Sequence, residues 1–102
     1  MTIEQLNYVI VLSEELSFTN ACQRLHLTQP ALSQSIKTLE NQLGVILFRR
    51  TTSEFEITYA GEQFVKAARE IMETKKNLLA ILDDINNLER GRLTIGVPNF
   101  RG

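Results

Sequence analysis

The sequence predicts a mainly α-helical protein: a winged helix-turn-helix of three helices and a β-hairpin, followed by a long dimerisation helix. Residues 18–44 hold two short helical patterns joined by a tight turn, and an alternating apolar and polar segment comes soon after them. From residue 58 a long stretch lacks proline and repeats apolar residues every seven positions. We therefore expect a winged helix-turn-helix domain at 1–57, a linker helix at 58–90 and the first strand of a truncated further domain at 91–102.

The composition is that of an ordinary globular chain, with 102 residues of which 43% are hydrophobic and 23% charged. The N-terminus lacks a basic segment followed by an apolar one, and no apolar run approaches the ~20 residues of a membrane span. A lone cysteine, Cys22, excludes an internal disulfide. We therefore expect a cytoplasmic protein that does not contact a membrane.

The net charge of −1 hides an uneven distribution of charged residues. Residues 1–23 contain three glutamates and no basic residue, and residues 51–102 are nearly balanced. In residues 24–50 a single glutamate faces the basic side chains of Arg24, Lys37, Arg49 and Arg50. This positive segment is a modest indication of a polyanionic partner, and it indicates an affinity gained through dimerisation.

The first two helices are marked by their N-terminal caps. Thr2 and Gln5 have the spacing of a capping box, which opens the first helix. Ser17 is the expected cap of the second helix. The inward face of that second helix is expected to be Phe18, Ala21, Cys22 and Leu25. Residues 26–28 then form the turn, and the three helices make a small core.

The third predicted helix has two distinct faces. Its apolar face is expected to be Leu32, Ile36, Leu39 and Leu43. Thr28 caps its first turn, Pro30 is tolerated at this early position, and Gly44 ends the helix with a positive φ. The opposite face carries Gln29, Ser33, Gln34 and Lys37, with no carboxylate. Such side chains bond to base edges and phosphates, which suits a recognition helix.

Residues 46–58 predict a β-hairpin, because apolar residues flank the polar segment 49–54 and alternation follows it. A hairpin after a recognition helix is a wing, which can touch the DNA backbone or minor groove beside the main contact. Consecutive strand residues point to opposite faces, so Arg49 and Arg50 are not expected to share a role.

A long helix is predicted from the cap at Thr58 to about Leu88, with its end at Gly91. Roughly 30 helical residues span ~45 Å, too long for one small domain to cover, so the apolar stripe requires a partner helix. The predicted dimerisation residues are Phe64, Ile71, Leu78, Leu82 and Ile85. Residues 92–97 alternate like a strand, which we interpret as the start of a second domain cut off at the end of the chain.

The segment SFTNACQRLHLTQPALSQSIKTLENQLGVILFRR, with the later ITYAG, resembles the N-terminal domain of LysR-type transcriptional regulators. The match covers about residues 3–61, and the long helix and GRLTIGV continue it in order. The resemblance implies a winged helix-turn-helix that binds double-stranded DNA and a linker helix that pairs two subunits antiparallel. It also implies a C-terminal effector-binding domain of periplasmic-binding-protein type.

These features predict a transcription regulator that binds inverted-repeat operators as a homodimer, or as a tetramer at full length. RNA polymerase is a candidate partner. No cofactor is expected in these 102 residues, and a small-molecule effector is expected in the missing C-terminal domain. The operator, the regulated genes, the effector and the choice between activation and repression do not follow from the sequence.

The resemblance implies a major-groove face formed by Gln29, Pro30, Ser33, Gln34 and Lys37. Thr28 completes this predicted set on the helix, and Arg50 is implied to reach DNA from the wing. Two departures weaken the expected contact with phosphates. Gln34 stands where the family often has arginine, and the wing carries Glu54 and Glu56 where basic residues are common.

Each assignment has a plainer alternative. The polar face of the third helix could be ordinary solvated surface, and Arg50 could pair with Glu54 or Glu56. Cys22 and His26 fall two ligands short of a structural zinc site, so a core cysteine and a turn histidine are expected. A single histidine without a nucleophile arrangement predicts no enzyme. The rival function is a helical adaptor module, which would not bind duplex DNA at any salt concentration.

Overall fold

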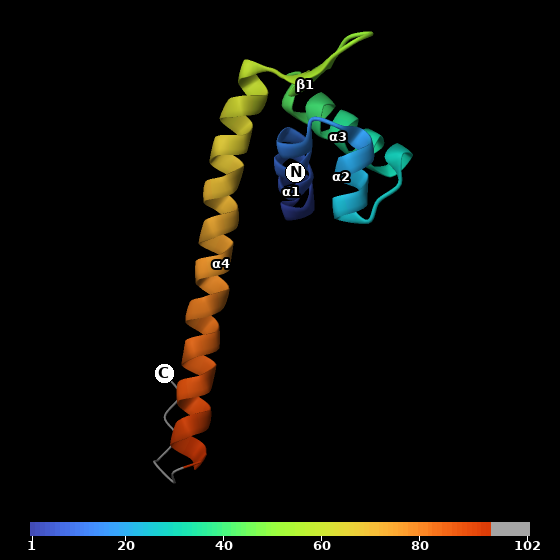
Figure 1. The fold of residues 1–102 in the computed structure, drawn as a ribbon. Coiled ribbons are helices and arrows are strands. Elements are labelled where there is room, and N and C mark those ends of the chain that lie inside the picture. The colour runs from blue at the N-terminus through green and yellow to red at the C-terminus, as the bar shows by residue number, and fades with distance from the viewer. Residues whose placement is uncertain (95–102) are drawn as a thin grey trace. The chain divides into compact units, whose positions relative to one another are not determined.

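The computed structural model describes residues 1–94 of the chain and the side chains of residues 1–91. The elements are α1 (Ile3–Glu15), α2 (Phe18–Leu25), α3 (Gln29–Leu43), β1 (Phe48–Arg50), β2 (Phe55–Ile57) and α4 (Tyr59–Thr94) (Figure 1). The predicted mainly helical winged helix-turn-helix with a long final helix is confirmed. The chain divides into two units, Met1–Met72 and Glu73–Gly102, and α4 runs through both.

The predicted caps of the first three helices are present. Thr2 and Gln5 form the capping box of α1, in which each backbone N–H donates to the other side chain at 2.9 and 3.1 Å. The hydroxyl of Ser17 accepts from a backbone N–H of α2, and that of Thr28 accepts from one of α3. Gly44 ends α3 with φ of 71°.

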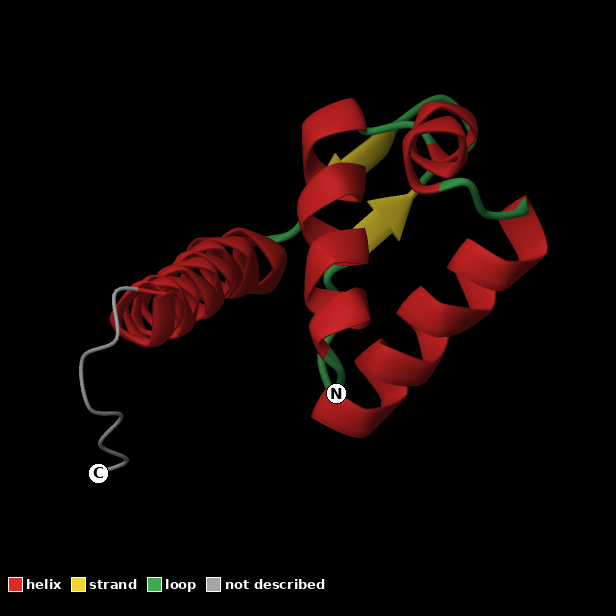
Figure 2. Cartoon of the chain, turned by 90° about the horizontal axis from the view of Figure 1, so that it is seen from below, coloured by secondary structure: helices red, strands yellow, loops and turns green. Residues whose placement is uncertain are grey.

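The core of Met1–Met72 lies where α1, α2 and α3 meet (Figure 2). The largest fully buried side chains are Leu12, Leu32, Leu39, Leu47 and Val9. The predicted inward face of α3 is confirmed at Leu32, Ile36 and Leu39. It is wrong at Leu43, which is 39% exposed because it is the last residue of α3, where the chain turns away at Gly44.

The wing is a two-stranded antiparallel hairpin in which Arg49 pairs with Glu56 and Arg50 pairs with Phe55. Alternation along the strands puts Arg49 and Arg50 on opposite faces. The Phe48 and Phe55 rings stack on the Arg50 face with centroids 5.4 Å apart. The hairpin therefore has one aromatic face that carries Arg50 and one charged face.

Thr58 joins the wing to the start of α4. Its hydroxyl donates to the carbonyl oxygen of Ile46 at 2.6 Å and accepts from the N–H of Gly61 at 3.0 Å. Gly61 is buried, and a Cβ at this position would collide with the carbonyl oxygen of Leu47 and with Ile57. Only glycine fits this close approach, so these contacts fix the first turn of α4 on the wing.

The first turns of α4 pack on the core of their own unit. Val65 and Ala68 are buried, and Phe64 and Met72 pack against the core as partly buried residues. The prediction that the whole apolar stripe lacks cover within one chain is therefore wrong for Phe64. Its ring is covered because α4 starts beside β1, which brings this turn onto the helical core.

The predicted end of α4 at Gly91 is also wrong, since the helix continues to Thr94. Gly44 is the only described glycine with a positive φ, so Gly91 lacks the backbone conformation that ends helices. Residues 92–94 are helical where a strand was predicted, and the remainder of that predicted strand, residues 95–97, lies outside the described residues. Within residues 1–94 no helix combines the length and the mean hydropathy required to cross a membrane.

Candidate nucleic-acid interface

The polar face of α3 is exposed, as predicted. The side chains of Gln29, Ser33, Gln34 and Lys37 are all exposed, and so are those of Thr28 and Pro30 at the start of the helix. The one carboxylate in α3 belongs to Glu40, which is partly buried. A helix with this outer face presents amides, a hydroxyl and a cation to the solvent without an exposed competing anion.

Threonine hydroxyls orient both glutamine side chains. Gln29 Nε2 donates to Thr19 Oγ1 at 3.3 Å, and Gln34 Nε2 donates to Thr38 Oγ1 at 3.2 Å. Each amide keeps its oxygen and one N–H for another partner. That remaining pair of one donor and one acceptor matches the major-groove edge of adenine. Sequence reading missed Thr19, because the contact joins two helices and no local spacing predicts it.

Arg50 lies beside the start of α3. A groove of about 240 Å³ is lined by Phe18, Gln29, Pro30, Ser33 and Arg50. A second groove, of about 360 Å³, has Arg50, Ser33 and Lys37 among its lining residues. The structure therefore brings Arg50 together with the predicted helix residues Gln29, Pro30, Ser33 and Lys37. Gln34 lines neither groove.

Two phenylalanine rings hold the Arg50 guanidinium. Its ζ carbon lies 4.4 Å from the centroid of Phe18 and 5.7 Å from that of Phe55. Among residues 1–91, Arg50 forms no ion pair with Glu54 or Glu56, so that alternative does not describe this structure. Sequence reading had placed Phe18 in the core alone, since the ring is apolar and its contact with residue 50 is distant in sequence.

Glu40 fixes the wing to α3. Its Oε2 accepts hydrogen bonds from the backbone N–H groups of Leu47 at 2.7 Å and Phe48 at 3.2 Å. Charge-assisted bonds to two consecutive N–H groups hold the start of β1 at a defined place on the recognition helix. In the sequence this glutamate was counted only as a negative charge, although its being the only acid of the predicted helix was a usable signal.

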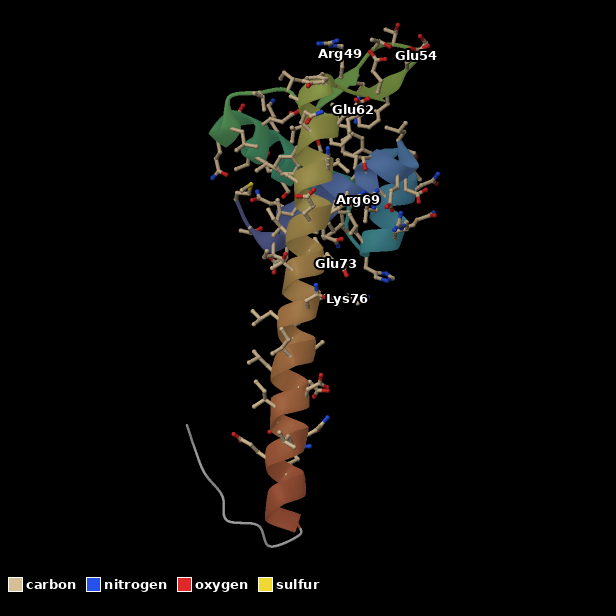
Figure 3. All side chains as sticks on the ribbon, turned by 90° about the vertical axis from the view of Figure 1, so that its left-hand side faces the viewer. Arg49, Glu54, Glu62, Arg69, Glu73 and Lys76 are labelled. Carbon is tan, nitrogen blue, oxygen red and sulfur yellow. The ribbon has the colours of Figure 1, made fainter. Side chains whose placement is uncertain are left out.

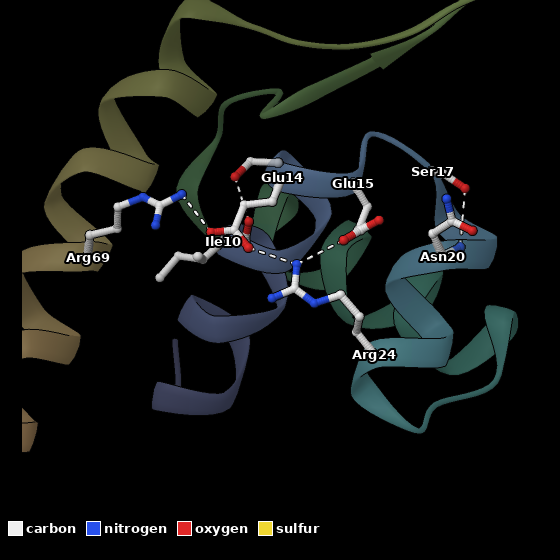
Figure 4. A network of polar contacts seen from close by, with 8 residues as sticks. Ile10, Glu14, Glu15, Ser17, Asn20, Arg24 and Arg69 are labelled. Atoms are coloured by element: carbon white, nitrogen blue, oxygen red, sulfur yellow. Dashed lines mark hydrogen bonds and ion pairs between the residues drawn. The ribbon is translucent and has the colours of Figure 1, made fainter.

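A second set of charged residues joins α1, α2 and α4 (Figure 4). Glu14 bonds to Arg24 at 2.8 Å and to Arg69 at 2.9 Å, and Glu15 bonds to Arg24 at 3.0 Å. The hydrogen bond from Arg24 lowers the pKa of Glu14, and the Arg69 bond adds to this while partial burial opposes it. Arg24 is therefore neutralised, and it does not add to the positive surface as its position in the sequence had suggested.

The predicted dimerisation residues other than Phe64 are exposed. Ile71 is 42% exposed, and Leu78, Leu82 and Ile85 are each about half exposed. Leu79, Ile81 and Leu88 extend the apolar surface. Charged residues such as Glu73 and Lys76 also lie on this part of α4 (Figure 3). Ile71, Leu78, Leu82 and Ile85 recur at helical spacing and form one stripe. Ile81 and Leu88 lie along one side of it, and Leu79 lies along the other.

Cys22 and His26 have separate environments. Cys22 is a buried free cysteine, and His26 is exposed at the end of α2 with φ of 56°. Among the residues that the structure describes, no three histidine, cysteine, aspartate or glutamate side chains gather where they could hold a metal ion.

Comparison with known proteins places these features in one family. Residues 3–62 match the model of the bacterial regulatory helix-turn-helix proteins of the lysR family. The HTH-type transcriptional regulator XapR of Escherichia coli (strain K12) is 39% identical over 95 residues, which cover 93% of this chain and 32% of XapR. BsdA, an HTH-type transcriptional regulator of Bacillus subtilis (strain 168), is 36% identical over 97 residues, or 94% of this chain and 33% of BsdA.

A solved structure agrees with these sequence matches. The crystal structure of a complex of the BenM DBD with catB site 1 DNA superposes with a TM-score of 0.80 at 30% identity. The match covers 84% of this chain and 97% of the BenM chain. The chain spans about a third of the length of the curated relatives that it matches, 33% of BsdA and 32% of XapR.

Proposed function

Because the chain belongs to the LysR family of bacterial helix-turn-helix regulatory proteins, we propose that it is the DNA-binding and dimerisation part of a transcription regulator. Two copies bind an inverted-repeat operator in double-stranded DNA, and each copy places α3 in the major groove. The β1–β2 hairpin lies at the flanking backbone or minor groove. The family and the relatives named above are transcription regulators and not enzymes.

The observation that carries this proposal is the surface shared by α3 and the wing. Gln29 and Ser33 supply amide and hydroxyl groups for base edges, and Arg50 lies next to them in one groove. Lys37 adds a second cation on the same side. Glu40, the one acid on α3, is occupied by two backbone N–H groups. The surface therefore combines base-reading groups with cations for phosphates.

The exposed stripe on α4 supports the dimer. An isolated helix that exposes this many apolar side chains is marginal in water, and pairing with a second copy removes them from solvent. Two reading surfaces then add their contacts on the operator, which offsets the modest charge of each one. At full length we expect a dimer or tetramer, a small-molecule effector bound by the rest of the protein, and RNA polymerase as a candidate partner.

The proposal is tested by selection of duplexes from a randomised pool, followed by titration with salt. The proposal expects an inverted repeat whose half-sites are one helical turn or a multiple apart, and a linear loss of log affinity with log salt. Gln29→Ala or Ser33→Ala should weaken specific binding by ~1–3 kcal/mol and leave non-specific binding nearly unchanged. An adaptor module would select no duplex, and that result would refute the proposal.

A further inference from the structure

We infer that Phe18 is a positioning residue for DNA binding: its ring holds the Arg50 guanidinium beside the first turns of α3. There the arginine binds the phosphate that borders the bases read by Gln29 and Ser33. This inference rests on the proposed function, because it names the ligand of one side chain within the proposed DNA surface. It gives Phe18 a role in binding in addition to its place at the edge of the core.

The aromatic platform under Arg50 is itself fixed. The rings of Phe18 and Phe55 pack edge to face with centroids 5.2 Å apart, and Phe55 also stacks on Phe48. Phe18 and Phe55 are partly buried against the core, and Phe48 is buried. The platform thus joins α2 to both strands of the wing, and a guanidinium lying over it has a defined position.

Stacking holds Arg50 without using its hydrogen-bond donors. The ζ carbon of the guanidinium lies 4.4 Å from the centroid of the Phe18 ring, and none of the side-chain hydrogen bonds within residues 1–91 uses an N–H of Arg50. Arg24 offers the contrast, since it donates to Glu14 and Glu15 and is neutralised by them. Within residues 1–91 Arg50 has no such partner. A fixed cation with free, coplanar donors is suited to a bidentate bond to phosphate.

The position of Arg50 indicates which phosphate it binds. It shares one groove with Gln29, Pro30 and Ser33 in the first turns of α3, and another with Gln29 and residues 51–54 at the tip of the hairpin. A helix that lies in the major groove has phosphates along the edges of that groove. Arg50 therefore lies between the reading helix and the wing tip, and it faces the backbone at the edge of the major groove.

Holding Arg50 in place before DNA binds lowers the conformational entropy that is lost on binding. An arginine that is already held loses less rotamer freedom when it binds, so removing the ring weakens binding while the charge remains. Phe18→Leu should weaken duplex affinity roughly three- to ten-fold and keep the salt slope of the wild type. Arg50→Ala should weaken it more and flatten the salt slope by about one per subunit.

The deciding experiment is a double-mutant cycle on the 102-residue chain, with a duplex selected by the wild type from a randomised pool. If Phe18 acts through Arg50, Phe18→Leu should have no further effect on affinity in the Arg50→Ala background. Phe18→Tyr, which keeps the ring face, should bind like the wild type. Tyr8→Leu serves as the matched control, because Tyr8 is a partly buried aromatic residue of the same core without a ring contact to Arg50.

A spectroscopic measurement keeps the inference testable even if Phe18→Leu weakens the fold. In the wild type without DNA, ring currents should move the NMR signals of the Arg50 side chain upfield. Ordinary positions for those signals would overturn the inference. If Phe18→Leu weakened duplex affinity equally in the wild-type and Arg50→Ala backgrounds, the inference would also be overturned, and the proposed function would stay intact. Failure of the wild type to select any duplex would instead refute the proposed function, and with it this inference.

Discussion

Residues 1–72 and residues 73–91 carry similar aliphatic side chains but differ in what covers them. Every buried hydrophobic residue among the described side chains lies in the first region, at positions such as Leu12 and Leu39. In the second region every residue is exposed, including Leu78 and Ile85 at 52% and 49%. The first region completes its core within one chain. The second exposes apolar side chains along a helix, and the proposed function assigns DNA reading to the first region and pairing of two copies to the second.

The largest effect should follow from charges placed on the stripe. Replacing Leu78 and Ile85 together with aspartate should prevent pairing, because burial of each side chain contributes up to ~1.5–3 kcal/mol and aspartate reverses that gain. Operator affinity should fall at least ~100-fold, which corresponds to two powers of ten or ~2.8 kcal/mol. The measurement is duplex binding together with thermal unfolding of the first region, which should not change. Asp83→Asn and Asp84→Asn are controls on the same helix.

A pair of leucine substitutions sharpens the comparison. Leu12→Ala removes a fully buried side chain and should lower the free energy of unfolding by ~2–5 kcal/mol at any protein concentration. Leu82→Ala affects a side chain that is 52% exposed in a single chain, so its effect should depend on concentration. Denaturant unfolding at two protein concentrations separates the two cases. If both variants lost the same free energy of unfolding at every protein concentration, the division into two regions would be contradicted.

Two glycines in α4 should respond in opposite directions to the same substitution. Gly61→Ala places a Cβ against the Leu47 carbonyl oxygen and should destabilise the first region by about 2 kcal/mol. Gly91→Ala meets nothing within 4 Å and should stabilise the helix by ~0.5–1 kcal/mol. Thermal unfolding and helix content by circular dichroism report both changes. A stabilising Gly61→Ala would show that the wing does not approach α4 as closely as described.

The smallest effect concerns pH. The pKa of Glu14 is lowered from 4.5 by the bonds from Arg24 and Arg69, so its contribution to stability is complete above pH 4.5. It is lost as the pH falls through the lowered pKa of the folded state. About a third of the side chain is exposed (34%), so after screening the contribution should be only about 0.5 kcal/mol. In denaturant unfolding at several pH values, Glu14→Gln should remove this part of the pH dependence of the unfolding free energy. Glu62→Gln, the control, should leave that dependence unchanged.

Local signals in the sequence predicted most of the fold. Cap residues such as Thr2, Ser17 and Thr28, and the positive φ of Gly44, depend on neighbours within a few positions. The polar face of α3 follows from helical periodicity in the same way. These predictions were confirmed because the interactions that decide them are short in sequence.

Most of the missed features depend on segments that are distant in sequence. No local pattern places Phe18 under Arg50 or pairs Arg24 with the glutamates of α1. Phe64 was assigned to the dimer stripe because its spacing fits, although it packs against the core of its own chain and is partly buried there. Gly91 was read as a helix end because glycine favours that position, but glycine is only permissive and α4 passes through it.

The central claim is that the stripe on residues 71–88 is covered by a second copy of this chain. Sedimentation equilibrium of the 102-residue protein over a range of concentrations tests it most directly, since the mass of one chain is 11.6 kDa. Our account predicts twice that mass at micromolar concentration, and the mass of one chain for the variant with aspartate at positions 78 and 85. A wild-type protein that sediments as a single 11.6-kDa chain at every concentration would contradict it.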